Sequence, residues 1–261
     1  MSKLPLRDRH VVLTRPEGRS SDWKEQLAQA GAAVSELPLI AINFEPQHEV
    51  LGEVLDSMGE YDWMVFTSPN GVRGFFDRFF ERFADIRSIG AVRFACVGPA
   101  TEKTLRTYHL ESDLTATHSD AVNLGRELMS KFDIENQKVL VVTGNLNSPE
   151  LPRLLAEGAL AIVDTLRVYA TEETHLADSP EAAEFRKHGA DAIVFASPSA
   201  VESFIHQAAS LRPETGARQP KAIAVGPSTA EALRKAGIPL AGMAKAPTAK
   251  AICEAVLAAL T

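Results

Sequence analysis

The stretch Val65-Phe66-Thr67-Ser68-Pro69-Asn70-Gly71-Val72 decides the fold, because it returns 129 residues later as Val194-Phe195-Ala196-Ser197-Pro198-Ser199-Ala200-Val201. A second phrase, Val97-Gly98-Pro99-Ala100-Thr101, returns 128 residues later as Val225-Gly226-Pro227-Ser228-Thr229. Two phrases repeated in the same order and at nearly the same spacing indicate an internal duplication. Each phrase is an apolar strand that ends in a Ser-Pro or Gly-Pro turn and opens a helix. The chain is therefore predicted to contain two copies of one α/β unit.

The composition is that of an ordinary globular protein. The 261 residues have room for two domains, and 45% of them are hydrophobic while 23% are charged. The net charge of −7 gives no support to nucleic-acid binding, so any anionic ligand must be met by local groups. Polar Arg7-Asp8-Arg9-His10 precedes any apolar run, which argues against a signal peptide, and no run approaches the length of a membrane span.

The residues that usually hold cofactors or metals form no recognisable site. Cys96 and Cys253 lie in apolar stretches, so buried thiols in a reducing cytoplasm are expected rather than a disulfide or a metal site. The seven histidines are scattered and have no ligand spacing. The common dinucleotide, phosphate-loop, zinc and nucleophile motifs do not occur. We therefore expect no cofactor and no metal.

Short apolar runs and the turns after them predict the architecture. Six runs rich in Val, Ile and Phe lack polar alternation, as expected for parallel strands covered on both faces. Helix-period segments follow them, and Gly31, Gly158 and Gly237 stand where helices should end. Repeated strand–turn–helix units predict a doubly wound parallel sheet in each half. The predicted strands are Val11–Leu13, Met64–Phe66, Phe94–Val97, Val139–Val142, Ala192–Phe195 and Ala222–Val225.

Each half divides into four modules, and the simplest domain boundary is a cut near residue 135. The fourth modules have Ser119 and Thr248 as candidate helix starts. The segments Leu37–Pro46 and Leu166–Glu173 follow the first module of each half and are β-branched or contain proline. They are predicted to be extended connectors between domains.

The four strand-to-helix turns are the best functional clue. A helix N-terminus leaves backbone N–H groups unpaired and carries the positive end of the helix dipole, so it accepts carboxylate or phosphate. In an open parallel sheet these turns lie at the carboxyl ends of the strands, where ligands bind. Capping of the helices is the simpler alternative role. The side chains that add polar groups there are Ser68, Asn70, Thr101, Ser197, Ser228 and Thr229.

Two further residues are candidates for chemistry. Arg15, in Thr14-Arg15-Pro16-Glu17-Gly18 after the first strand, is able to grip a carboxylate by two parallel hydrogen bonds. Pairing with Glu17 or another nearby acid is an equal expectation. Tyr169 lies in the second connector and is one of three tyrosines, so its phenol is a candidate proton or hydrogen-bond donor. Packing at the hinge is the alternative role of Tyr169.

Taken together, the phrases resemble the uroporphyrinogen-III synthase family of tetrapyrrole biosynthesis. The resemblance covers most of the chain and rests on order and spacing, because each phrase alone is weak. The phrases are Leu13-Thr14-Arg15-Pro16, Phe66-Thr67-Ser68-Pro69-Asn70-Gly71-Val72, Val97-Gly98-Pro99-Ala100-Thr101, Val168-Tyr169, Ser197-Pro198-Ser199-Ala200-Val201 and Val225-Gly226-Pro227-Ser228-Thr229.

The resemblance implies a different domain boundary from the cut near residue 135. It implies two similar doubly wound parallel-sheet domains of flavodoxin-like α/β type, joined by two extended connectors. In this arrangement the first module of each half belongs to the domain that is formed mainly by the other half. One domain comprises residues 1–40 plus 172–261, and the other comprises residues 41–171.

The family's reaction is the cyclisation of hydroxymethylbilane, with inversion of the last pyrrole ring and loss of water but no cofactor. Departure of the hydroxyl leaves a delocalised cation, which the terminal pyrrole attacks through its substituted carbon to form a spiro intermediate. Spontaneous closure gives the symmetrical type I ring, so the enzyme must select geometry. The substrate carries eight carboxylates, which suits four anion-accepting turns. The expected cysteine environment favours the cytoplasm, and a monomer is the default expectation. Hand-over of substrate from the preceding deaminase is a further expected interaction.

The resemblance assigns functional roles to the residues of this chain that match the family's motifs in position. Tyr169 is the candidate catalytic group that assists departure of the hydroxyl. Family members often carry Arg-Gly where this chain has Thr143-Gly144, so no arginine role passes to that loop. The expected substrate-binding residues are Arg15, Ser68, Asn70, Gly71, Thr101, Ser197, Ser199, Ser228 and Thr229.

Two other functions are compatible with these residues. A non-enzymatic two-domain protein would bind a small anion with the same turns. A pair of receiver-like signalling domains is the weaker alternative, because no acidic cluster follows the first strand.

Overall fold

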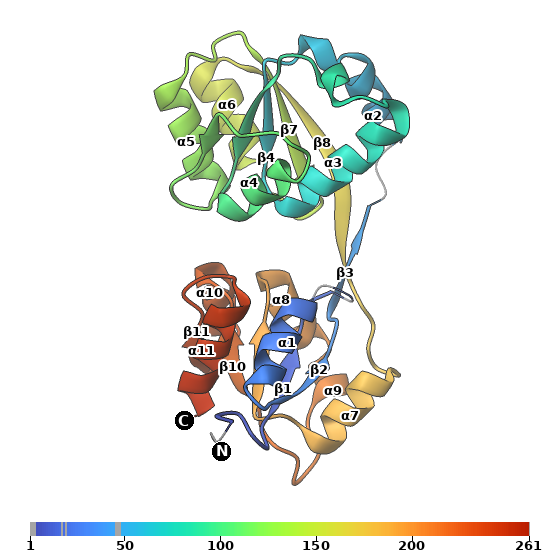
Figure 1. Cartoon of the computed structure of the whole chain (residues 1–261), viewed down its shortest axis with the longest axis vertical. Coiled ribbons are helices and arrows are strands. Elements are labelled where there is room, and N and C mark those ends of the chain that lie inside the picture. The colour runs from blue at the N-terminus through green and yellow to red at the C-terminus, as the bar shows by residue number, and fades with distance from the viewer. Residues whose placement is uncertain (1–3, 17, 19, 45–47, 261) are drawn as a thin grey trace. The chain divides into compact units, whose positions relative to one another are not determined.

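A computed structural model describes residues 4–16, 18, 20–44 and 48–260 (Figure 1). The chain divides into two compact units, and each is described by itself. Unit 1 comprises Met1–Ala41 and Glu172–Thr261, and unit 2 comprises Ile42–Thr171. Pro46 of the predicted connector and Glu17 lie outside the described residues.

Unit 1 contains a five-stranded sheet in the order β11-β10-β9-β1-β2. Every neighbouring pair is parallel. In chain order within the unit this is the 2-1-3-4-5 arrangement of flavodoxin-like sheets. The strands are β1 (His10–Leu13), β2 (Ala33–Glu36), β9 (Ala192–Phe195), β10 (Lys221–Ala224) and β11 (Leu240–Met243).

Helices cover both faces of this sheet because successive strand residues point to opposite sides. Val11 and Leu13 belong to one apolar core, while Val12 belongs to the other. The first core contains α1 (Ser21–Gln29) and α11 (Ala249–Leu260). The second contains α7 (Pro180–His188), α8 (Pro198–His206), α9 (Ala208–Leu211) and α10 (Pro227–Lys235).

Unit 2 contains a six-stranded sheet in the order β3-β8-β7-β4-β5-β6. The pairs from β8 to β6 are all parallel. Without β3, the order repeats that of unit 1 once β7 is matched with β1 by the duplication. The strands are β3 (Ile40–Asn43), β4 (Trp63–Phe66), β5 (Arg93–Cys96), β6 (Leu114–Thr115), β7 (Lys138–Gly144) and β8 (Ile162–Glu173).

Two cores also flank the sheet of unit 2. One holds a cluster of stacked and edge-on phenylalanines on α3, including Phe75 and Phe76. The helices on that side are α2 (His48–Asp56), α3 (Pro69–Arg82) and α4 (Pro99–Arg106). The other face carries α5 (Ala121–Lys131) and α6 (Glu150–Ala159). Two short 3-10 turns span Met58–Glu60 and Ile86–Ile89.

The predicted fold class is confirmed, because each unit is a doubly wound parallel α/β sheet. The six predicted strands occur, although the strands expected to reach Val97 and Val225 end one residue earlier, at Cys96 and Ala224. The first predicted connector contains β3, and the second, Leu166–Glu173, is the later part of β8; these two strands are neighbours in the sheet. Cys96 and Cys253 are buried free thiols, as expected. Burial raises the pKa of the Cys96 thiol to about 12.

Two of the three predicted helix ends at glycine are confirmed. Gly31 and Gly237 follow helices with φ of +101° and +70°, a conformation that glycine adopts without strain. The third prediction is wrong, because Gly158 lies inside α6. Leu160 instead takes the left-handed position that ends this helix.

Of the two candidate helix starts in the fourth modules, one is confirmed. Thr248 caps α11, since its Oγ1 accepts from the Ala251 N–H at 3.3 Å. Ser119 does not cap α5, because the carboxylate of Asp120 fills that role.

Within the described residues, none of the helices is both long enough and apolar enough to pass through a membrane.

The phenylalanine cluster on α3 offers a stability test with a matched control. Phe75 is fully buried, whereas Phe80 on the same helix is 42% exposed. We expect Phe75→Ala to lower the free energy of unfolding by about 3–5 kcal/mol, because it removes buried apolar surface and leaves a cavity. Phe80→Ala should cost below about 1 kcal/mol. Urea unfolding measures both, and equal losses would contradict the assigned packing.

Candidate functional site

Each unit has one switch point, where two neighbouring parallel strands lead onward to strands on opposite sides of the pair, through helices on opposite faces of the sheet. In unit 1 this switch point lies between β1 and β9, which are followed by α1 and α8. In unit 2 it lies between β7 and β4, which are followed by α6 and α3. The connections diverge there and leave a crevice at the carboxyl ends of the strands. Ser68, Ser197, Arg15 and Tyr169 all lie on segments at these strand ends.

The two Ser-Pro turns cap helices through their hydroxyl oxygens. Ser68 Oγ accepts from the Gly71 N–H at 2.9 Å, and Ser197 Oγ accepts from the Ala200 N–H at 3.2 Å. The capping alternative is therefore confirmed for both serines. Capping uses only the oxygen lone pairs, so each hydroxyl hydrogen is available for a second bond. The Oγ atoms of Ser197 and Ser199 lie 2.9 Å apart and are hydrogen-bonded to each other, with either hydroxyl able to donate.

The two Gly-Pro turns present backbone rather than side chains. Gly98 and Gly226 precede α4 and α10 in extended conformation and have no side-chain cap. The side chains of Thr101 and Thr229 are buried, so ligand contacts at these turns would come from backbone N–H groups. Ser228 alone among the predicted hydroxyls of these turns is exposed.

Tyr169 lies in β8 and is joined to a helix start in unit 2. Ser68 Oγ donates to Tyr169 Oη at 3.0 Å. The tyrosine is buried, and burial raises the pKa of the phenol while the bond from Ser68 lowers it in part. The net direction is upward, so the phenol is protonated at neutral pH. Because Ser68 is the donor in their bond, Tyr169 keeps its own hydrogen to donate.

Gly144 at the end of β7 is required by the position of Tyr169. The two residues are register partners in the β7–β8 pair. A methyl group added at Gly144 would lie 2.4 Å from Cζ of the tyrosine ring, far inside van der Waals contact. The ring thus packs directly on the backbone of the loop.

The loop after β7 is held by side-chain amides on both sides of Leu146. Asn147 Oδ1 accepts from the Gly144 N–H at 2.8 Å, and its Nδ2 donates to Thr67 Oγ1 at 3.0 Å. Asn145 exchanges two bonds with the backbone of Thr171, at 2.8 and 3.1 Å. The loop is therefore tied both to the end of β4 and to β8.

The other predicted polar residues have local partners. Arg15 lies 3.4 Å from the carboxylate of Asp22, and its guanidinium stacks 4.2 Å from the ring centroid of Trp23. The expectation of pairing with a nearby acid is thus met by Asp22, whereas Glu17 lies outside the described residues. Asn70 accepts from Arg73 at 3.4 Å. Thr143, where the family often has arginine, is a buried residue of β7.

The sequence reasoning missed Thr14, Thr67, Asn145 and Asn147. Thr14 Oγ1 donates to the Val194 carbonyl at 3.0 Å, and Thr67 Oγ1 donates to the Val142 carbonyl at 3.0 Å. Each threonine therefore ties together the two strand ends at a switch point. A hydroxyl directly after an apolar strand was the available signal. The roles of the asparagines carried no comparable signal, because their partners are distant in sequence.

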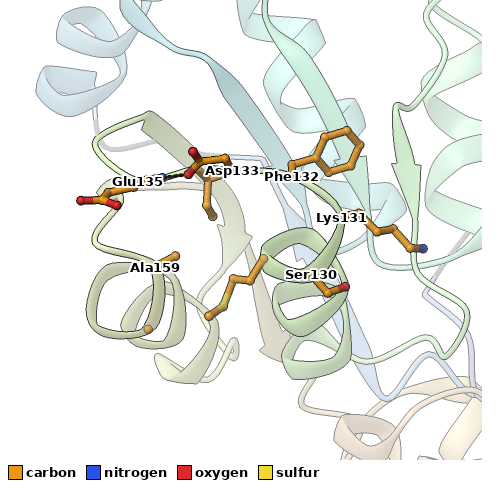
Figure 2. Close-up of a pocket in the computed structure, with 9 residues that line it drawn as sticks. Ser130, Lys131, Phe132, Asp133, Glu135 and Ala159 are labelled. Carbon is orange, nitrogen blue, oxygen red and sulfur yellow. Dashed lines mark hydrogen bonds between the residues drawn. The ribbon is translucent and has the colours of Figure 1, made fainter.

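A cavity elsewhere in unit 2 contains none of the predicted site residues. Figure 2 shows it beside the ends of α5 and α6, lined by Ser130, Lys131, Phe132 and Glu135 among others. These segments lead into the amino ends of β7 and β8, so this cavity of about 440 Å³ lies at the opposite end of the strands from the loop after β7. Among the described residues, no group of three or more His, Cys, Asp or Glu is arranged to hold a metal ion.

Comparison with known proteins identifies relatives that match most of the chain. The family model for uroporphyrinogen-III synthase HemD matches residues 21–254. The porphyrin biosynthesis protein HemD of Ruminiclostridium josui is 31% identical over 234 residues, which is 89% of this chain and 45% of that protein. The chain spans about half the length of the curated relatives it matches.

Two solved structures share the fold. A mutant uroporphyrinogen III synthase from Thermus thermophilus has a TM-score of 0.69 at 19% identity, over 97% of this chain and 98% of that one. The uroporphyrinogen-III synthetase of Helicobacter pylori 26695 has a TM-score of 0.62 at 20% identity, over 94% of this chain and 97% of that one. At these identities the likeness concerns the fold.

The raised pKa of Tyr169 predicts a pH dependence of stability. Its folded-state pKa lies above the ordinary 10.0, so the unfolded chain ionises first. The stabilisation is complete below about pH 10 and is lost as the pH rises toward the folded-state pKa. Tyr169→Phe should therefore lose less free energy of unfolding than the wild type on going from about pH 9 to 11.

Urea unfolding at each pH measures this difference, and an absorbance titration of tyrosinate identifies the group. The variant should lack a phenol that ionises above the ordinary value. Loss of a phenol with a pKa of about 10 or below would contradict the assigned environment of Tyr169.

Proposed function

The chain belongs to the uroporphyrinogen-III synthase family, and we propose that it closes hydroxymethylbilane to uroporphyrinogen III, inverting the terminal ring and releasing water. The family match over residues 21–254 supports the substrate and the reaction. The hydrogen-bonded pair Ser68–Tyr169 at a switch point supports a chemical role beyond binding.

The observation that carries the proposal is a chain of donors ending at Tyr169. The Gly71 N–H at the start of α3 donates to Ser68 Oγ, which donates to the phenol oxygen. Each bond polarises the next, and the helix N-terminus adds its positive dipole end. The phenol hydrogen is not used in the bond with Ser68 and would be donated to the substrate, and the oxygen is stabilised as it gains negative charge.

In the proposed reaction the phenol donates its proton to the departing hydroxyl. The carbon–oxygen bond of the substrate breaks, water leaves, and the electron pair of the pyrrole stabilises the resulting cation. The terminal pyrrole attacks that cation through its substituted carbon, and fragmentation and reclosure then give the inverted ring. The proton lost when the macrocycle regains aromatic pyrroles returns to the phenolate of Tyr169. The net change is loss of one water molecule, and it uses no cofactor.

The carboxylates of the substrate are proposed to bind at the helix starts. Backbone N–H groups there donate hydrogen bonds to anions even though the chain has a net charge of −7. At the Ser-Pro turns the capping serines belong to the site, whereas the Gly-Pro turns offer backbone. The proposed contacts are Arg15, Ser68, Asn70, Gly71, Ser197, Ser199 and Ser228, with the N–H groups of the turns that contain Thr101 and Thr229.

We further propose a monomer that acts in the cytoplasm and receives its substrate from the preceding deaminase. The buried free thiols of Cys96 and Cys253 support a reducing compartment. Direct hand-over would protect a substrate that closes spontaneously to the wrong isomer.

The test is to supply freshly generated hydroxymethylbilane and separate the type I and type III products. The wild type should form type III uroporphyrinogen. Tyr169→Phe should lower kcat by about 100-fold or more, because it removes a general acid. Tyr61→Phe is the matched control, since Tyr61 is also buried but donates to Asp164 away from the site. Its kcat should be unchanged.

A non-enzymatic anion binder would behave differently in the same assay. It would yield only type I product at the spontaneous rate, and Tyr169→Phe would weaken binding by about 1 kcal/mol at most. That outcome would overturn the proposed function.

A further inference from the structure

The loop after β7 presents an exposed apolar side chain at the switch point of unit 2. Leu146 is 62% exposed and stands between Asn145 and Asn147. We propose that Leu146 is a substrate-positioning residue that packs against the face of a pyrrole ring of the bound tetrapyrrole. This inference rests on the proposed function.

The loop holds Leu146 in position from both sides. Asn147 is bonded to the Gly144 N–H and to Thr67, and Asn145 is bonded twice to the backbone of Thr171. These bonds connect the loop to β4 and β8, the strands on either side of β7. Leu146 therefore lies on a fixed support, and its exposure is not that of a loosely held surface loop.

The same loop lies against the group proposed to act in catalysis. The backbone of Gly144 packs on the ring of Tyr169, and Leu146 follows two residues later. Ser68, on the neighbouring turn, is bonded to the phenol. A substrate hydroxyl placed at Tyr169 would bring the pyrrole ring that bears it beside this loop.

The chemistry of Leu146 fits that part of the substrate. Carboxylates match the N–H groups of the helix starts, whereas the flat pyrrole rings between them have apolar faces. Burying leucine methyl groups against such a face removes apolar surface from water. The contact would also restrict the tilt of the ring, which bears on the choice between the two ring isomers.

The chain offers a matched control for this position. Leu160 is also 62% exposed, but it ends α6 just before the amino end of β8, at the opposite end of the strands from Leu146. The two leucines thus have equal exposed fractions but lie at opposite ends of the strands, because Leu146 follows the carboxyl end of β7 and Leu160 precedes the amino end of β8. A general effect of removing an exposed leucine should appear in both variants.

The experiment compares Leu146→Ala and Leu160→Ala in steady-state assays with hydroxymethylbilane. Leu146→Ala should raise KM about tenfold, as expected for lost apolar contact. Its kcat should change less than about twofold, because Tyr169 and Ser68 keep their bonds. Leu146→Met should restore KM to near the wild-type value, since methionine fills a similar apolar volume. Leu160→Ala should retain the wild-type KM.

The outcomes separate this inference from the proposed function. A wild type that forms type III product, together with a Leu146→Ala variant of unchanged KM, would overturn the role of Leu146 alone. Equal increases of KM in both alanine variants would also overturn it. A wild type that forms no type III product would instead overturn the proposed function. Thermal unfolding of Leu146→Ala should match that of the wild type, because the side chain is exposed.

Discussion

Two adjacent parallel strands that lead to helices on opposite faces of a sheet create the constraint on which this protein depends. The helices diverge, so the carboxyl ends of the two strands cannot be covered by either connection. Each unit buries apolar side chains on both faces of its sheet, while backbone polar groups emerge from the sheet at these strand ends. Serine, threonine and asparagine side chains gather there because backbone groups that leave the sheet need partners.

The hydrogen bonds at the unit 2 switch point connect segments that are distant in the sequence. Ser68 and Tyr169 are bonded, although about a hundred residues separate them. The Asn147–Thr67 bond links the loop after β7 to the turn after β4. The tyrosine remains protonated because burial opposes its ionisation, while Ser68 supplies a donor that favours charge on the oxygen once a proton leaves. A protonated phenol beside a helix start is a combination suited to assisting a leaving group.

Local rather than global electrostatics explains how an acidic chain would bind a polyanion. Arg15, the arginine expected to grip a carboxylate, already stacks on Trp23 and pairs with Asp22. The helix starts supply positive potential without a net positive charge. They also lie at the strand ends, so the backbone that leads from each strand into its helix would provide the binding groups. Apolar contact through Leu146 would supply what these groups lack, a surface that recognises the rings between the carboxylates.

The sequence by itself determined the strands, the duplication and the capping turns, because these depend on residues close together in the chain. Short apolar runs without polar alternation that are bounded by turn residues are typical of strands covered on both faces, and Ser-Pro at a strand end starts a helix. Even local signals can be ambiguous where neighbouring residues are able to fill the same role. Asp120 caps α5 in place of the adjacent Ser119, and α6 continues past Gly158. The tertiary structure alone decided the burial of the Thr101 side chain, the Tyr169–Ser68 bond and the anchoring of Leu146. Those features depend on which strands become neighbours, and a pairing between distant segments leaves no mark in the local pattern of either one.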